Sequence, residues 1–418
     1  MAITKLCVHN FKSFADLELD MERPITVLIG ANASGKSNVL SAFQFLRDIR
    51  RFGLRDAISI QGGIEFLRNI HLASTEDFSM RVTAKPNKPQ TRVRMRTRSV
   101  HATYHTLEYE FVISFHGYRS GYKIIKDSIS AHCDFILRSG EMYKGILEIS
   151  RFDNKVKTNL TPAPELEQHT DALRYIRNYL LETLYIPFPR KSLLLESFIP
   201  NFFFGPDFDA FFDQLKSFDF DPKKSKKASH VVGRATLNED GSNLSVILHR
   251  IFSSRREKAK FSKYLSYLLP FVKGLRVSSF PDKSLLLVMK EKYYENRFLP
   301  GFALSDGTLS AVCLITALFF DESSTLLIEE PDRNIHPSLI GKLHKLFQEA
   351  SEFKQILITT HNPLSLRQVE LRDIRLISRD ANGLSRISRP SENEEVKEFL
   401  KNDIGIDEIF VNNLFQDE

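Results

Sequence analysis

The sequence predicts an α/β fold that carries an antiparallel β subdomain and a helical insertion. An apolar strand at residues 25–29 leads through a glycine-bounded loop into a segment with apolar residues at helical spacing. Strands and helices alternate again over residues 273–385. Residues 85–162, in contrast, are rich in β-branched and aromatic residues separated by Asn, Pro, Gly and Lys, which is typical of antiparallel strands.

These features divide the chain into five expected segments. Residues 1–84 and 273–385 would form the two parts of one α/β core. Residues 85–162 would form the β subdomain, residues 163–272 the helical insertion and residues 386–418 a polar C-terminal tail.

Composition excludes several classes of protein. Of the 418 residues, 42% are hydrophobic and 26% are charged, which is close to average usage and excludes global disorder. No apolar run of about 18 residues occurs, and the N-terminus lacks a basic-then-apolar leader. The three cysteines have no CxxC spacing. We therefore expect a cytoplasmic protein with no membrane partner.

Residues 30–37 read GANASGKS and fit the phosphate-binding pattern GxxxxGK[ST]. Gly30 and Gly35 let backbone N–H groups point inward around phosphates, and a helix begins at the same place. Lys36 is expected to reach the β- and γ-phosphates of ATP, and the Ser37 hydroxyl to bind Mg²⁺. A plain glycine turn is disfavoured by the flanking strand and helix. The other expected nucleotide contacts in this region are Asn32, Ser34 and Asn38.

Residues 325–331 (TLLIEEP) form an apolar strand that ends in two acids. Glu329 is expected to hold Mg²⁺ directly or through water. Glu330 is expected to orient or deprotonate the attacking water. A solvated acidic strand end is the alternative, and the phosphate-binding loop in the same chain disfavours it.

Further motifs resemble those of ABC-type ATPases. Residues 304–310 (LSDGTLS) resemble the signature motif, and residues 356–363 (ILITTHNP) resemble the strand that carries the switch histidine. Residues 10–14 (NFKSF) are similar to the N-terminal segment of RecF-, SMC- and OLD-type members. Residues 329–337 and 237–244 resemble the AAA_15/AAA_21 group. The chain thus resembles an ABC-type P-loop ATPase head.

The resemblance implies a homodimer, or a higher oligomer, that encloses ATP between two chains. Ser305 and Gly307 would contact the γ-phosphate in trans, and His361 would contact it in cis as a catalytic residue. Lys12 would lie at the edge of the pocket. Hydrolysis would be slow and would depend on protein concentration. For His361, a buried core histidine is the alternative.

Three positions depart from the ABC pattern. Glu329 stands where many members have Asp. Because its side chain is longer, direct binding of the metal by this residue does not follow from the resemblance. Asp306 and Thr308 replace the usual Gly and Gln of the signature. Gln61 is the one weak candidate for the Q-loop glutamine. No long heptad segment occurs, which excludes an SMC-type arm within this chain.

Only 57 residues follow His361 (418 minus 361), too few for the metal-dependent TOPRIM nuclease domain of OLD-type proteins. The chain therefore resembles the stand-alone ATPase components of anti-phage systems such as PARIS, in which a separate effector supplies the toxic activity. That role is a family analogy.

Three functions from different classes stay open. The leading one is an ATP-hydrolysing sensor and scaffold that controls an effector protein, a nuclease or toxin, in prokaryotic anti-phage defence. The second is a RecF-like ATPase that binds DNA in repair or recombination. The third is an assembly scaffold with little turnover. A transporter subunit is disfavoured by the insertions and the atypical signature.

Basic and aromatic clusters leave the partners open. With 58 basic and 52 acidic residues, the charge balance favours nucleic acid only slightly. Arg92, Arg94, Arg96 and Arg98 would form either a phosphate track or a solvated hairpin. Lys223–Lys227 would be a flexible surface loop. The phenylalanines from Phe202 to Phe212 would be core or an exposed patch for another subunit.

Overall fold

The computed structural model describes two compact units. The described residues are 1–86, 101–116, 121–136, 140–152, 155–164, 188–204, 206–231, 236–294, 297–402, 404–412 and 414. Unit 1 comprises residues 1–23, 38–215 and 379–387, and unit 2 comprises residues 24–37, 216–378 and 388–418. The boundary between the units falls in the first turn of helix α1 (Lys36–Phe52).

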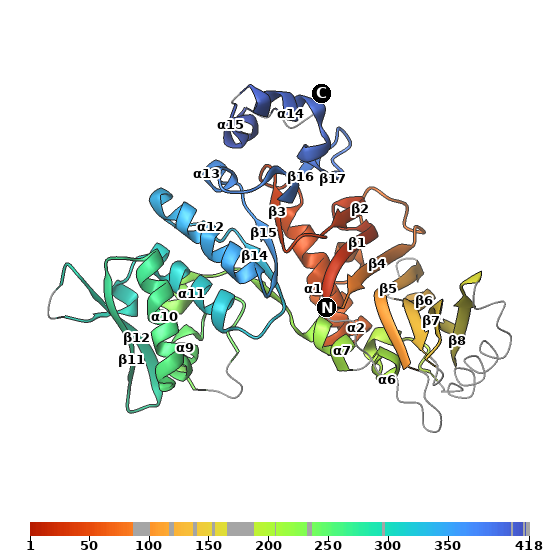
Figure 1. Cartoon of the computed structure of the whole chain (residues 1–418), viewed down its shortest axis with the longest axis horizontal. Helices are drawn as coiled ribbons and strands as arrows, with labels where there is room; N and C mark the ends of the chain where they lie inside the picture. Colours follow the sequence, from red (N-terminus) through yellow and green to blue (C-terminus); the bar gives the residue numbers. More distant parts are fainter. Residues whose placement is uncertain are drawn as a thin grey trace. The chain divides into compact units, whose positions relative to one another are not determined.

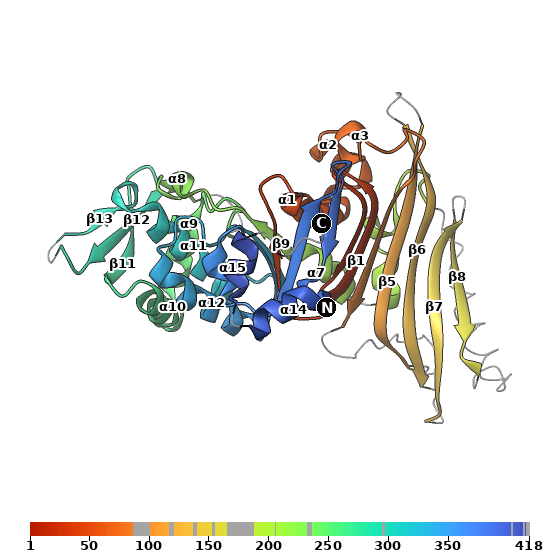
Figure 2. The ribbon, with the colours of Figure 1, turned by 90° about the horizontal axis from the view of Figure 1, so that it is seen from above.

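Unit 1 is built on a seven-stranded antiparallel sheet with the order β2-β1-β4-β5-β6-β7-β8. Figure 2 shows β5 to β8 as long neighbouring strands. Burial alternates along β4, because one face of the sheet packs against the core and the other does not. The strands are β1 (Ala2–Phe11), β2 (Phe14–Asp20), β4 (Phe78–Lys85), β5 (His101–His116), β6 (Gly121–Ile136), β7 (Met142–Phe152) and β8 (Lys155–Pro162).

Aromatic side chains join the sheet of unit 1 to α1. Phe78 of β4 lies at its centre, with ring centroids 6.1 Å from Phe11, 5.8 Å from Phe45 and 5.8 Å from Phe111. All four rings are fully buried. The other helices of the unit are α2 (Leu54–Ile60), α3 (Ile64–Leu67), η1 (Leu194–Glu196), α6 (Ile199–Phe204) and α7 (Pro206–Asp213).

Unit 2 contains a largely parallel sheet, whose strands run in the order β16-β3-β15-β14-β9. Helix α11 (Asp306–Phe320) is buried on nearly every side from Thr308 to Phe319, as expected for a helix inside a core. Helix α12 (Pro337–Ser351) packs beside β15 (Figure 1). The strands are β3 (Ile25–Ile29), β9 (Leu215–Phe218), β14 (Thr325–Glu329), β15 (Gln355–Thr359) and β16 (Ile374–Arg379).

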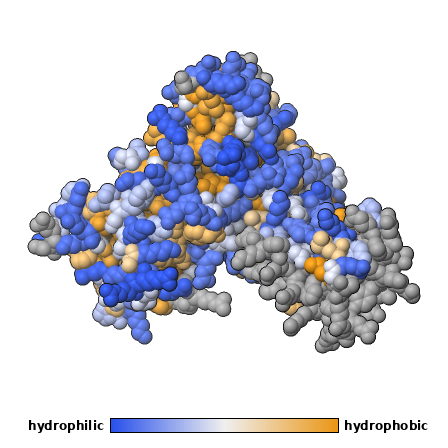
Figure 3. Space-filling view, in the orientation of Figure 1, coloured by the Kyte–Doolittle hydropathy of each residue, from blue (hydrophilic) through white to orange (hydrophobic). Residues whose placement is uncertain are grey.

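A smaller antiparallel sheet in unit 2 has the order β10-β12-β11, and β13 pairs with β12. Hydrophilic residues predominate on the visible surface around helix α10 (Arg255–Leu268; Figure 3). The strands are β10 (Ser229–His230), β11 (Val272–Ser279), β12 (Ser284–Glu291) and β13 (Leu299–Pro300). The remaining helices are α8 (Pro222–Ser225), α9 (Leu244–Ser253), α10 (Arg255–Leu268), α13 (Pro363–Leu366), α14 (Glu394–Lys401) and α15 (Ile406–Val411).

The α/β fold class and the antiparallel β region expected from the sequence are confirmed. The two units nevertheless group the segments differently from the five-part division. Strands β1 and β2, expected in the α/β core, pair with each other, and β1 pairs with β4 of the antiparallel sheet. The arginines between residues 92 and 98, and residues 165–187 of the expected helical insertion, lie outside the described residues. Within the described part of the chain, no helix is both long and apolar enough to cross a bilayer.

We expect the substitution Phe78→Ala to lower the free energy of unfolding by about 3–5 kcal/mol, because it removes a ring that three other buried rings contact. Urea denaturation measures this change. Phe198, which is 73% exposed, provides the matched control. Phe198→Ala should change the unfolding free energy by less than about 0.5 kcal/mol. Equal effects of the two substitutions would contradict the central position of Phe78.

Candidate functional site

The register of three parallel strands brings the expected site residues of unit 2 to one edge of its sheet. Glu329 at the end of β14 pairs with Thr359 of β15, and Thr359 pairs with Leu28 of β3. Carboxyl ends of parallel strands lie at the same edge of a sheet, where α/β proteins bind their ligands. The loop after β3, the acids after β14 and the segment after β15 therefore meet there.

The loop after β3 has the conformation that its sequence requires. Gly30 has a φ of +152°, and a Cβ atom at this position would lie only 2.2 Å from the carbonyl oxygen of Ile377. Ala33 and Gly35 also have positive φ values, +62° and +118°. Asn32 is exposed and Ser34 is buried. The loop thus curls tightly before α1 begins at Lys36.

The Lys36 side chain folds back over the loop. Its Nζ donates hydrogen bonds to the carbonyl oxygens of Gly30 (2.8 Å) and Ala31 (2.9 Å). Burial lowers the pKa of Lys36, and the nearby carboxylates of Glu330 and Glu329 oppose that shift. A phosphate bound in the loop would replace the two carbonyl oxygens as the partner of this ammonium group.

Ser37 and Glu329, both expected to bind Mg²⁺, are in contact. The Ser37 hydroxyl donates to Oε1 of Glu329. The longer Glu side chain at a position where many ABC proteins have Asp therefore does reach the loop. Hydroxyl and carboxylate oxygens suit Mg²⁺, which usually binds one or two carboxylates together with substrate phosphates and waters. In the described residues, no group of three or more His, Cys, Asp and Glu could hold a metal ion alone.

Glu330 is held in a strained backbone conformation that directs its side chain. Its φ is +44°, which is unusual for a residue other than glycine. Its backbone N–H donates to the carbonyl oxygen of Thr359 at 3.0 Å. Its Oε1 lies 2.7 Å from Nδ1 of His361. The His361 side chain is 51% exposed, so the alternative of a buried core histidine is wrong.

A buried carboxylate that was not expected as a site residue connects the two loops. Asp332 is only 6% exposed, and its Oδ2 accepts hydrogen bonds from the hydroxyls of Thr360 (2.6 Å) and Ser365. Thr360 Oγ1 in turn accepts from the backbone N–H of Asn362 at 3.0 Å. This network fixes the segments on both sides of His361. Its signal in the sequence was its place two residues after Glu330, inside the block 329–337 that resembles the AAA_15/AAA_21 group.

The expected signature residues lie at the start of α11. Ser305 caps this helix, and its Oγ accepts a hydrogen bond from the backbone N–H of Thr308 at 3.2 Å. Gly307 lies against the next loop, because a Cβ atom there would approach the carbonyl oxygen of Asn334 to 2.2 Å. The unusual Thr308 is buried, and its hydroxyl lies 2.7 Å from that of Ser305. Contact with a phosphate in trans stays a prediction.

Lys12, Asn38 and Gln61 belong to unit 1, where they line a pocket of about 680 Å³. Lys12 has a φ of +48°, and burial lowers the pKa of its side chain. Asn38 donates from Nδ2 to Oγ of Ser13 at 2.7 Å, and Ser13 also contacts Ser385 of strand β17 (Ser385–Ser388). Two expected nucleotide contacts and the weak Q-loop candidate therefore share one pocket.

The structure describes part of the phenylalanine cluster at residues 202–212 and the lysine cluster at residues 223–227. Phe208, Phe211 and Phe212 are buried, which confirms the core interpretation, whereas the side chains of Phe202 and Phe203 lie outside the described ones. The expectation of a flexible loop at residues 223–227 is wrong. Asp221 caps the short helix α8 there, and Lys224 and Lys226 form ion pairs with Asp240 (2.9 Å) and Asp306 (2.6 Å).

We expect Asp332→Ala to lower the free energy of unfolding by about 2–5 kcal/mol, because two buried hydroxyl donors lose their acceptor. Urea denaturation of the full chain measures the loss. Asp56 is exposed in the first turn of α2, and Asp56→Ala should cost less than about 1 kcal/mol. A neutral effect of Asp332→Ala would show that the network does not hold the two loops together.

Curated relatives match only short stretches of the chain. It is 44% identical over 46 residues to the "DNA replication and repair protein RecF" of Natranaerobius thermophilus, which covers 11% of this chain and 12% of that protein. It is 39% identical over 69 residues to the RecF protein of Gloeobacter violaceus, covering 16% of this chain and 18% of that protein. The matches thus span less than a fifth of these relatives.

Two solved structures are similar over most of the chain at low identity. The "SMC head domain from Thermotoga maritima" has a TM-score of 0.42 and 15% identity, and covers 93% of this chain and 99% of that one. The "SmcHead bound to the C-winged helix domain of ScpA" has a TM-score of 0.47 and 14% identity, covering 93% and 98%.

Family models give the broader match. The model described as "AAA ATPase domain" (AAA_15) matches residues 1–89. The model described as "AAA domain, putative AbiEii toxin, Type IV TA system" (AAA_21) matches residues 147–367. The expected resemblance to the AAA_15/AAA_21 group is confirmed, and the resemblance to PARIS stays a prediction. Because the AAA_21 match covers 221 of the 418 residues, this chain belongs to the AAA_21 family of ABC-type P-loop ATPases.

Proposed function

We propose that this chain binds ATP with Mg²⁺, dimerises around the nucleotide, hydrolyses it slowly, and thereby controls a separate effector protein in prokaryotic anti-phage defence. The observation that carries the ATPase proposal is the set of contacts at one sheet edge. The phosphate-loop residues Lys36 and Ser37 lie beside Glu329 and Glu330, with Ser37 in direct contact with Glu329.

Each side chain at this edge has a distinct proposed role. Lys36 exchanges its two carbonyl partners for the β- and γ-phosphates, while the backbone N–H groups of the loop donate to the same phosphates. Ser37 and Glu329 would hold Mg²⁺, which supplies positive charge at the leaving oxygens. Asn32, Ser34 and Gly35 belong to the loop that encloses the phosphates.

Glu330 is the proposed base, and His361 is its partner. The carboxylate orients a water molecule towards the γ-phosphorus and accepts one of its protons as the new P–O bond forms, while the bond from the γ-phosphorus to the bridging oxygen breaks and that oxygen leaves with ADP. His361 can donate from Nδ1 to Glu330 across the observed 2.7 Å, which leaves Nε2 free to face the γ-phosphate. The strained backbone of Glu330 and its bond to Thr359 keep the carboxylate in place.

The start of α11 is the part of this chain proposed to contact the ATP bound by a second copy. Ser305 is exposed at the N-terminus of a 15-residue helix, where backbone N–H groups and the helix dipole favour an anion. Gly307 has no side chain that would cover this end. Lys12 and Asn38 are also proposed as nucleotide contacts.

The role in defence has narrower support. It comes from the family, whose description names a toxin of a type IV toxin–antitoxin system. The RecF-like alternative has support in the short matches to RecF proteins. Turnover that duplex DNA stimulates, and that falls steeply between about 50 and 200 mM salt, would favour the alternative.

We expect Glu330→Gln to bind ATP but to reduce phosphate release by at least about 100-fold, since a general base contributes about 10²–10⁴-fold. With ATP and Mg²⁺, light scattering should then give about twice the mass of the chain. Lys36→Ala should bind ATP weakly and stay at the mass of a single chain, because the ammonium group that pairs with the phosphates is absent.

Glu352→Gln is the matched control, because it removes the same charge from an exposed position after α12. It should turn over ATP like the unmodified chain. If neither Lys36→Ala nor Glu330→Gln changes mass or turnover, the hydrolytic mechanism is wrong. A nucleotide-dependent increase in mass with no measurable hydrolysis in the unmodified chain would favour the third function, an assembly scaffold.

A further inference from the structure

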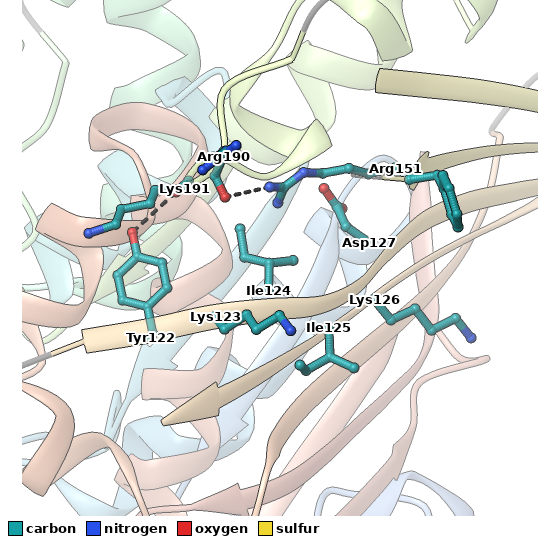
Figure 4. Close-up of a pocket in the computed structure, with 10 residues that line it drawn as sticks. Tyr122, Lys123, Ile124, Ile125, Lys126, Asp127, Arg151, Arg190 and Lys191 are labelled. Atoms are coloured by element: carbon teal, nitrogen blue, oxygen red, sulfur yellow. Dashed lines mark hydrogen bonds between the residues drawn. The ribbon is translucent and has the colours of Figure 1, made fainter. Parts of the chain in front are cut away.

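A second pocket lies in unit 1, where strand β6 extends beyond its neighbour β7. The two strands pair only over residues 128–136 of β6, so residues 121–127 continue past the last paired position. A cavity of about 880 Å³ lies beside this extension, lined also by Arg151 and Phe152 and by the loop that contains Arg190 and Lys191 (Figure 4). Cavities of about 300–1,000 Å³ are typical of small-molecule sites.

A β-bulge shapes the strand that forms the floor of this pocket. Lys126 pairs with Val112 of β5 and Ile124 pairs with Ile113, which leaves Ile125 as an extra residue between them. A bulge changes the direction of the side chains that follow it and is frequent beside binding sites. Beyond the bulge, Lys126 is exposed and the next residue, Asp127, is buried.

Positive charge predominates among the lining side chains. Lys126 forms an ion pair with Glu110 of β5 at 2.6 Å. In the described part of the chain, by contrast, no carboxylate forms an ion pair with Lys123, Arg190 or Lys191. An anion would therefore gain charge-assisted hydrogen bonds here without displacing an existing partner. The basic residues of the lining are Lys123, Lys126, Arg151, Arg190 and Lys191.

The loop that carries two of these cations is held in place. Arg151 donates to the carbonyl oxygens of Ser192 (3.2 Å) and Arg190. The Tyr122 hydroxyl donates to the carbonyl oxygen of Lys191 at 3.1 Å. Figure 4 shows Arg151 and Tyr122 at opposite ends of the pocket, each bonded to this loop. The side chains of Arg190 and Lys191 are exposed and thus free to bind a ligand.

The buried carboxyl of Asp127 favours a ligand that also carries a hydrogen-bond donor. It is 1% exposed, and its Oδ2 accepts a hydrogen bond from the backbone N–H of Leu194 at 2.7 Å. Its Oδ1 makes no well-formed hydrogen bond within the described residues, although the buried hydroxyl of Tyr109 faces this carboxyl. Burial raises the pKa of this carboxyl to about 7. A buried acceptor whose hydrogen bonding is incomplete is costly, so a ligand that supplies an N–H or O–H group of better geometry than the Tyr109 hydroxyl would be stabilised there.

We propose that this pocket binds a nucleoside phosphate, as a ligand site separate from the phosphate-binding loop of unit 2. The phosphate binds among Lys123, Arg190 and Lys191, and a hydroxyl or amino group of the nucleoside donates to Asp127. The ring of Tyr122 provides an apolar surface for the base. Free inorganic phosphate would satisfy the cations alone, whereas a nucleoside phosphate also satisfies the carboxyl.

Isothermal titration calorimetry of the full chain tests this proposal. The titrations use the Lys36→Ala variant, so that phosphate binding by the loop of unit 2 is impaired. The ligands are the 5′-monophosphates of adenosine, guanosine, cytidine and uridine. At least one should bind with a stoichiometry of one per chain. Adding Arg190→Ala and Lys191→Ala should weaken that binding at least about tenfold, because two charge-assisted contacts are lost. This result does not depend on ATP hydrolysis.

The matched control replaces two exposed basic residues of α10. Arg256→Ala with Lys263→Ala removes the same charge in unit 2 and should change the dissociation constant by less than about twofold. Circular dichroism verifies folding, and Lys123→Ala serves as the second test if the double variant does not fold. No binding of any monophosphate, or equal binding by the pocket and control variants, would overturn the proposal.

Two further titrations distinguish a nucleoside phosphate from an inorganic phosphate as the ligand. One uses the Asp127→Asn variant, and the other uses inorganic pyrophosphate. The substitution keeps the shape of the side chain but removes its negative charge, so it should weaken nucleotide binding by about fivefold or more and leave pyrophosphate unaffected. If pyrophosphate binds as tightly as the nucleotides and Asp127→Asn changes neither, the nucleoside part of the proposal is wrong.

Discussion

The parallel register of β3, β15 and β14 is the constraint on which the candidate ATP site depends. Leu28, Thr359 and Glu329 occupy one row of the sheet, and the hydrogen bonding continues for one residue beyond the strands. Thr360 donates its backbone N–H to the carbonyl of Leu28, and Glu330 donates to that of Thr359, both at 3.0 Å. A slip of one residue in any strand would turn these side chains to the opposite face. The core behind the sheet therefore determines the geometry of the site.

The parts of this site that the sequence predicted are those specified by local chemistry. Gly30 and Gly35 supply the positive φ values that the loop requires, and Lys36 and Ser37 follow at fixed spacing on a helix start. The buried strand before Glu329 is one unbroken apolar run. Each of these signals lies within about ten residues, the range over which local pattern and turn chemistry operate.

The parts that were missed depend on contacts between distant residues. Asp332 binds Thr360 and Ser365, which are 28 and 33 positions later, and no local pattern links them. The exposure of His361 and the burial of Phe208 likewise follow from tertiary packing, so the sequence left both open. The bulge in β6 also depends on its pairing with β5, so the sequence predicted strands over residues 85–162 but not this irregularity.

The two sites differ in how they balance charge. At the sheet edge of unit 2, one ammonium group, Lys36, lies near two carboxylates, Glu329 and Glu330. A bare triphosphate would therefore meet repulsion from both carboxylates, which a bound divalent cation would relieve. Among the described residues that line the pocket of unit 1, several are cations and one is a buried carboxyl, Asp127, whose pKa burial raises to about 7. The pocket of unit 1 would accept a phosphate without a metal ion, whereas the sheet edge of unit 2 would take a phosphate together with a cation. The two proposed sites therefore favour ligands of different net charge.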